Sequence, residues 1–397
     1  MSFCSVYIPV GVPTYHLETA QDHFERSCAM LRGVDPDFVC PDEMLLTLDK
    51  LRAYLDGLNP DLIVFQNLTF ANAAYMAEVL RRYDCPMLLW TLREPVIDGG
   101  RLRLNSLTGA YSAANTLAAF DGRAFNWCFG APEEESVVSA VKATVEAARV
   151  KKAMRSLTMS AIGHTPQGFG FGRALDSELM NTFGVELESI EARELIDMAK
   201  TYTDEECAEY LRDTESCTCG LDKTPENNRN DHARLLKAYR DYVRTHHIGA
   251  LASRCWPDFF TSFGTPVCTV LSMLNDEGVA AACEADIYGA LSMWIGMQLS
   301  GEPVFSEIRS RWMKPKVPSP TGTAVLQPAA SPARIPARSS AYTPTARSVP
   351  PWTSAVKLSP RQPSSASAAS RTEASASLWR RGPFWTSRSS SSALPSW

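Results

Sequence analysis

The sequence has no apolar run long enough to span a bilayer, and its first residues, MSFCSVYIPVG, lack a basic segment followed by an apolar core. The first absence argues against a transmembrane helix, and the second argues against a secretory signal peptide. The eleven cysteines are odd in number, lack the spacing of a disulfide framework and all lie before residue 284. Reduced thiols explain this pattern better than disulfides, so we expect a cytoplasmic protein.

Several catalytic signatures are also missing from the chain. It contains no Walker or Rossmann fingerprint, no serine-hydrolase elbow and no kinase signature. Cys217 and Cys219 have no second cysteine or histidine pair at zinc spacing, which argues against a metal site there. Any chemistry must therefore come from other residue types.

Charge is distributed unevenly along the chain. The part after Ile308 holds thirteen Lys and Arg residues and one acid, Glu373, so 26 basic and 43 acidic residues remain before it, a net charge of about −17. The strongly negative net charge of residues 1–308 argues against nucleic acid and anionic membranes as partners. The final arginines could belong to a nucleic-acid-binding arm, but they are scattered among Ser and Pro, which argues against it.

Up to about residue 305, short apolar runs alternate with amphipathic segments, the pattern of a parallel sheet with crossover helices. The pattern restarts after a long helical segment, so we predict two consecutive open parallel-sheet α/β domains, 1–155 and 156–305. Residues 43–58 are expected to form one helix, and the polar segment 215–231 a loop. Residues 306–397 are predicted to be a low-complexity, disordered tail.

Acidic residues stand at two strand ends of the second predicted domain. Asp258 follows the strand expected to end near Trp256, and Glu284 and Asp286 end the apolar run VAAACEAD. Ligands of open α/β sheets bind beyond the carboxyl ends of the strands. Acids in this position cost desolvation unless a positive group, such as a divalent cation, pairs with them. The alternative is that they cap the helices that follow.

Two further residues are candidates to bind a substrate. His164 begins the segment HTPQGFGFG, whose glycines permit a tight, close-packed turn after another expected strand, and Trp256 lies beside Asp258. The histidines of THH at 245–247 are expected only to end a helix, where cationic imidazoles are favoured. Carboxylates around a hard metal suit sugar-oxygen chemistry, because the metal polarises a carbonyl while a carboxylate moves a proton.

Six segments together resemble the L-fucose/L-arabinose isomerase family: LREP, RLRLNSLTGA, FNWCFG, HTPQGFGFG, RCWPDFFTSFGTPVCTVLSMLNDEG and AACEADIYGALSM. The resemblance extends along most of residues 1–305 and is most specific in the last two segments. It implies a cytosolic, Mn²⁺-dependent aldose–ketose isomerase that acts on a small sugar. It also implies two α/β domains followed by a β-rich third domain, in a homo-oligomer with active sites between subunits.

The resemblance further implies a metal site made of a Glu and an Asp from the second domain and a His from the third. Asp286 matches the family's Asp, and Asp258 stands near the earlier carboxylate, although it is Asp rather than Glu. We therefore predict Asp258 and Asp286 as catalytic residues, with Glu284 as a further metal ligand. A sugar-binding or regulatory α/β protein without chemistry is the alternative function.

The third domain that the resemblance implies is replaced by Ser-, Pro- and Arg-rich sequence after about Arg309. A shifted reading frame explains the replacement. If the third base of each codon is read with the first two bases of the next, Gly322–Ala337 permit WHCGTAACSLAREDTG and Thr343–Lys357 permit HPNRKVGPTMDFGCK. These reconstructed strings, absent from the printed sequence, resemble the family's third domain. We therefore expect weak or absent isomerase activity from the chain as written. A genuine low-complexity tail is the alternative.

Overall fold

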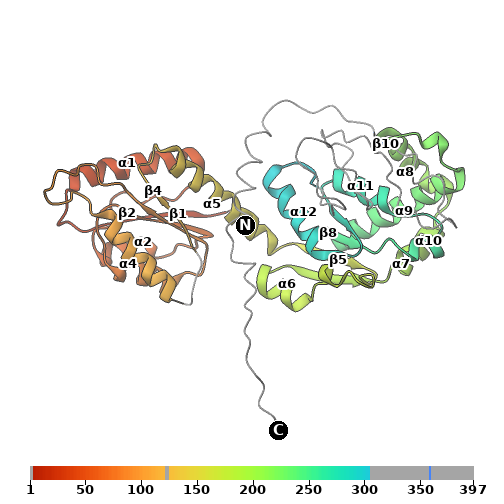
Figure 1. The fold of residues 1–397 in the computed structure, drawn as a ribbon, viewed down its shortest axis with the longest axis horizontal. Helices are drawn as coiled ribbons and strands as arrows, with labels where there is room; N and C mark the ends of the chain where they lie inside the picture. The colour runs from red at the N-terminus through yellow and green to blue at the C-terminus, as the bar shows by residue number, and fades with distance from the viewer. Residues whose placement is uncertain (1–2, 121–124, 305–356, 359–397) are drawn as a thin grey trace, which may run out of the picture. The chain divides into compact units, whose positions relative to one another are not determined.

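Two four-stranded parallel sheets organise the chain, one in each of two compact units, Met1–Ala153 and Met154–Trp397 (Figure 1). The computed structural model describes residues 3–120, 125–304 and 357–358. The prediction of consecutive parallel-sheet α/β layers is confirmed. The reason is that apolar runs such as LIVF, the first four residues of LIVFQN, can be buried on both faces only inside a helix-covered sheet.

The first sheet has the strand order β1-β2-β3-β4. Its strands are β1 (Ser5–Val10), β2 (Leu62–Asn67), β3 (Met87–Thr91) and β4 (Asn126–Phe129). Helices α1 (Leu17–Val34) and α5 (Glu135–Met154) cover one face, and α2 (Leu48–Leu55), α3 (Ala73–Arg82) and α4 (Ser106–Ala119) cover the other. Side chains of β1 alternate between the two cores, with Tyr7 in one and Ile8 in the other.

The expected helix at 43–58 is wrong in its first third. Only Leu48–Leu55 is helical, and Leu45 instead forms a parallel bridge with Val10. The Thr47 hydroxyl ends the extended segment, because it accepts a hydrogen bond from the Lys50 amide and so caps α2. Apolar residues before Thr47 matched a helical period but are buried beside the sheet.

In the first unit, the glutamate of the LREP motif, Glu94, binds the backbone of a loop. The Glu94 carboxylate accepts hydrogen bonds from the backbone amides of Arg103 (2.6 Å), Leu104 (3.1 Å) and Asn105 (2.9 Å). Asn105 lies in the left-handed region at φ 51° and directly precedes α4. Glu94 therefore fastens the start of α4, which is a structural role for this part of the motif.

The second sheet has the strand order β6-β5-β8-β9. Its strands are β5 (Thr158–Ile162), β6 (Glu186–Ile190), β8 (Ile248–Ser253) and β9 (Ala280–Cys283). The core on one face is built with α7 (Ala192–Thr201), α8 (Asp204–Cys217), α9 (Glu226–His246), α10 (Asp258–Ser262) and α11 (Cys268–Asp276). Helix α12 (Ile287–Ser300) packs against β8 and β9, and α6 (Asp176–Phe183) packs against β6.

The loop expected at 215–231 is wrong at both ends, because α8 continues to Cys217 and α9 already begins at Glu226. Helix α8 starts with a capping box formed by Thr203 and Glu206. It buries a narrow stripe that includes Tyr210, while its other faces are acidic. Because most residues of α8 are polar, the helical spacing of its few buried residues is difficult to recognise in the sequence. His247 ends α9 in the left-handed conformation, which confirms the helix end predicted at THH.

The predicted disordered tail falls outside the described residues except at β10 (Lys357–Leu358). These two residues pair antiparallel with β7 (Thr218–Cys219). Within the described residues, every helix is too short or too polar to cross a membrane.

Candidate active site

Three neighbouring strands bring the predicted site residues to one edge of the second sheet. His164 follows β5, Asp258 follows β8, and Glu284 and Asp286 follow β9. The three strands are adjacent and parallel, so their carboxyl ends lie side by side. The site residues predicted from the sequence therefore lie along one continuous edge of the sheet.

Asp286 caps helix α12. Its Oδ1 accepts a hydrogen bond of 2.9 Å from the Gly289 amide. Two glycines allow the backbone to approach this side chain: a Cβ at Gly289 would lie 2.5 Å from Asp286 Oδ2, and one at Gly172 would lie 2.9 Å from the Asp286 Cα. The capping alternative is thus confirmed for Asp286, and the Gly-rich segment makes the predicted close-packed turn against it.

Asp286 substitutions should separate its capping role from its charge. We expect Asp286→Ala to lower the free energy of unfolding by about 1 kcal/mol, because Ala cannot accept the Gly289 bond. Asp286→Asn should leave stability nearly unchanged, because Asn caps helices as well as Asp does. Urea unfolding of both variants tests this, and equal stability of the two would contradict the capping role.

Asp258 is paired with an arginine rather than acting as a cap. The Arg254 guanidinium lies 2.9 Å from Asp258 Oδ2, and Arg254 stands four residues before Asp258 in the sequence. Asp258 is the first residue of α10, and the preceding cap residue, Pro257, makes no side-chain cap bond. The positive partner expected for a strand-end acid is therefore present as Arg254.

Glu284 has an unusual backbone. Glu284 and Ala285 adopt φ values of 60° and 53°, two consecutive non-glycine residues in the left-handed region. Such conformations cost energy and are enriched at functional sites. Burial raises the pKa of the Glu284 carboxyl, and the attraction of Arg254 offsets only part of that rise. A desolvated carboxylate on a strained turn makes Glu284 the most distinctive acid of this edge.

Both predicted substrate-binding residues present their side chains to solvent. The Trp256 side chain is 62% exposed and stands between Arg254 and Asp258 in sequence. The His164 side chain is 78% exposed, with Nε2 lying 3.7 Å from Glu191 Oε1. Neither is held in the core, so both are accessible to a ligand at the edge.

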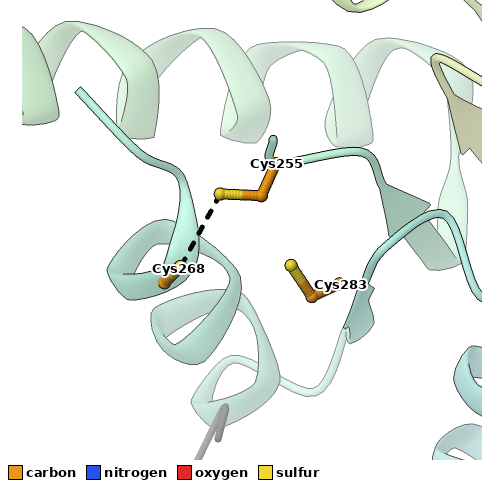
Figure 2. Close-up of side chains that lie close together, drawn as sticks. All are labelled: Cys255, Cys268 and Cys283. Carbon is orange, nitrogen blue, oxygen red and sulfur yellow. Dashed lines mark hydrogen bonds between the residues drawn. The ribbon is translucent and has the colours of Figure 1, made fainter. Parts of the chain in front are cut away.

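The carboxylates supply the donor type that a hard divalent cation such as Mn²⁺ prefers, and Glu284 is already desolvated. They do not by themselves complete a metal site. Within the described residues, the only three metal-ligating side chains gathered within reach of one ion are Cys255, Cys268 and Cys283 (Figure 2). A further ligand to a carboxylate-bound metal would have to come from elsewhere.

This cysteine cluster was not predicted from the sequence. Its members are widely separated along the chain and form no paired motif. One signal was available, because Cys255 and Cys283 stand at the ends of β8 and β9, the strands already singled out for their acids. None of these three cysteines forms a disulfide.

Comparison with known proteins decides the family. No protein-family model matches the chain. It is 59% identical over 299 residues to a sulfoquinovose isomerase of Clostridium sp. (strain MSTE9), a match that covers 75% of this chain and 67% of that protein. The chain belongs to the sulfoquinovose isomerase family. A sulfoquinovose isomerase of Priestia megaterium (strain ATCC 12872 / QMB1551) is 31% identical over 304 residues, and one of Alkalicoccus urumqiensis is 32% identical over 297 residues.

This result corrects the assignment to the L-fucose/L-arabinose isomerase family, which is wrong. The motifs used for that assignment include structural elements such as the Glu94 loop and the Asp286 cap. These features report the scaffold and do not discriminate between sugars. The matches span about two thirds of the length of the sulfoquinovose isomerases compared and three quarters of this chain.

Proposed function

We propose that the gene's product in the intact frame interconverts sulfoquinovose and its ketose by proton transfer through an ene-diol. The observation that carries this proposal is the 59% identity to a sulfoquinovose isomerase. The desolvated, strained Glu284 at the carboxyl edge of β9 supports it, because isomerisation needs a carboxylate that moves a proton between adjacent carbons.

The strand-end carboxylates have complementary roles in this proposal. Asp258, Glu284 and Asp286 are the candidate ligands of a Mn²⁺ ion, which when bound would supply Lewis-acid polarisation of the sugar carbonyl. Among the described residues the three carboxylates are not gathered within reach of one ion, so their side chains would have to move to hold it together. Asp286 offers Oδ2, because Oδ1 is engaged in the helix cap. Asp258 and Asp286, the strand-end acids predicted as catalytic, remain candidates for the proton carrier. Glu284 joins them, because its half-buried carboxylate lies on the left-handed turn at the same edge of the sheet.

Binding of the sugar falls to exposed groups around the carboxylates. Trp256 offers an aromatic face to the apolar side of a sugar ring, and His164 offers a ring nitrogen to a hydroxyl. We also propose a cytoplasmic homo-oligomer with active sites completed by neighbouring subunits.

We propose that residues after about Ile308 are read in a shifted frame. The permitted strings WHCGTAACSLAREDTG and HPNRKVGPTMDFGCK support this, as does the unmatched third of the relatives' length. The in-frame string contains a histidine in a stretch resembling the third domain, which would complete the carboxylate ligand set. The chain as written lacks that histidine, so its activity is expected to be weak or absent.

A turnover assay tests both proposals. The gene is resequenced around the codon of Ile308, and a version with the intact frame, here called the frame-restored chain, is purified with Mn²⁺. We expect the frame-restored chain to convert sulfoquinovose to a ketose, and the chain as written to be at least about 100-fold slower. A folded, Mn²⁺-loaded frame-restored chain without turnover would favour a sugar-binding protein instead. Equal activity of both chains would contradict the frame proposal.

A further inference from the structure

The three thiols at the carboxyl edge of the second sheet converge from three separate elements. Cys255 follows β8, Cys268 is the first residue of α11, and Cys283 is the last residue of β9. Their sulfur atoms all lie within 4.8 Å of one another, and the Sγ atoms of Cys255 and Cys268 are 3.7 Å apart. Figure 2 shows the three side chains directed toward a common centre.

These distances match a tetrahedral thiolate site. Zinc binds thiolate sulfur at about 2.3 Å, so two sulfurs on one tetrahedral ion lie about 3.8 Å apart. The Cys255–Cys268 separation of 3.7 Å already equals that edge. It far exceeds the sulfur–sulfur bond of a disulfide, about 2.05 Å. The third sulfur, from Cys283, gives the cluster one thiol more than a disulfide needs.

A carboxylate lies beside one thiol of the cluster. Glu284 Oε1 lies 3.9 Å from the Cys283 Sγ. Glu284 is not gathered with all three sulfurs in the described residues, so the cluster itself supplies three of the four positions of a tetrahedral ion. Cys255 is only 3% exposed, and Cys268 and Cys283 are half-buried, so the cluster is largely shielded from solvent.

We propose that Cys255, Cys268 and Cys283 form a three-thiolate binding site for a thiophilic divalent cation of the zinc class. Thiolates select zinc over hard ions such as Mn²⁺, so this site is distinct in chemistry from the carboxylate site. Binding releases the thiol protons to solvent.

Cobalt titration of the reduced, metal-free chain as written tests the site without reference to activity. Tetrahedral Co²⁺–thiolate coordination gives a near-ultraviolet charge-transfer absorption that carboxylate coordination does not. We expect this absorption to saturate at one Co²⁺ per chain and to disappear when Zn²⁺ is added. Cys268→Ser and Cys283→Ser should weaken Co²⁺ binding by about tenfold or more, because each removes a thiolate ligand.

Cys207→Ser is the matched control, since Cys207 is a buried cysteine of the same unit outside the cluster. It should leave the absorption unchanged. Circular dichroism reports whether each variant folds, and Cys268→Ser and Cys283→Ser provide two independent tests. Absence of the absorption from the folded chain would overturn the proposal. An unchanged absorption in both folded variants, or a Cys255–Cys268 disulfide in peptide maps of the chain kept under reductant, would also overturn it.

Discussion

Glu284→Gln is expected to lower kcat for sulfoquinovose by about 10²–10⁴-fold in the frame-restored chain, the usual contribution of a positioned general base. Gln keeps the size and hydrogen-bonding capacity of Glu but cannot accept a proton at neutral pH. Glu and Gln both carry a Cβ, so the substitution does not change the energetic cost of the positive φ at residue 284. A loss of activity would therefore report the carboxylate rather than the backbone.

Glu186→Gln is the matched control for this substitution. Glu186 is an exposed glutamate at the opposite end of its strand, the first residue of β6. It should retain full activity. The affinity for Mn²⁺, measured by electron paramagnetic resonance, separates a lost ligand from a lost base. A Glu284→Gln variant that keeps both kcat and Mn²⁺ affinity would remove Glu284 from the proposed site.

The second large effect concerns stability in acid and depends on His232. This residue of α9 is buried, and its Nε2 lies 3.1 Å from the Thr214 Oγ1 of α8. Burial, with a contribution from Arg240, lowers the pKa of His232 from 6.5 to about 4. In the unfolded chain the imidazole has its ordinary pKa, so the unfolded state binds more protons between about pH 6.5 and pH 4. Stability is therefore lost as the pH falls through that window.

The size of the effect follows from the shift. Between pH 7.5 and pH 4.5, His232 should remove about 2–3 kcal/mol from the free energy of unfolding. His232→Gln should reduce the acid-induced loss by that amount in urea unfolding at the two pH values. His247→Asn is the control, because His247 is exposed and Asn tolerates its left-handed conformation. An identical pH dependence in wild type and His232→Gln would contradict a neutral buried imidazole.

Much of the fold could be predicted because both sheets are buried on two faces. Strand β9 and the first four residues of β2 are continuous apolar runs, and in the helices between the strands apolar residues recur every three to four positions. The failures occurred where polarity and local capping overrode that pattern. Thr47 ends an apolar segment that lies beside the sheet, and the acidic surface of α8 obscures its buried stripe.

The edge that carries the site could also be predicted, because strand ends in a parallel sheet meet at one edge. The interactions and backbone conformation of each acid could not be predicted from the sequence. Asp286 as a helix cap, Asp258 paired with Arg254 and Glu284 on a strained turn all depend on side-chain and backbone geometry. The cysteine cluster depends on folding as well, since its members come together only through the sheet. The identity of the sugar could not be predicted, because motif residues such as Glu94 and Asp286 have structural roles that are independent of the sugar.

The most direct test of the central claim is to follow the frame-restored chain with sulfoquinovose and Mn²⁺ in D₂O by nuclear magnetic resonance. A carboxylate-mediated proton transfer predicts formation of the ketose with solvent deuterium at the carbon that receives the proton. Glu284→Gln should suppress both signals together. If no ketose forms while the folded chain binds Mn²⁺, or if ketose forms at the wild-type rate in Glu284→Gln, the account is contradicted.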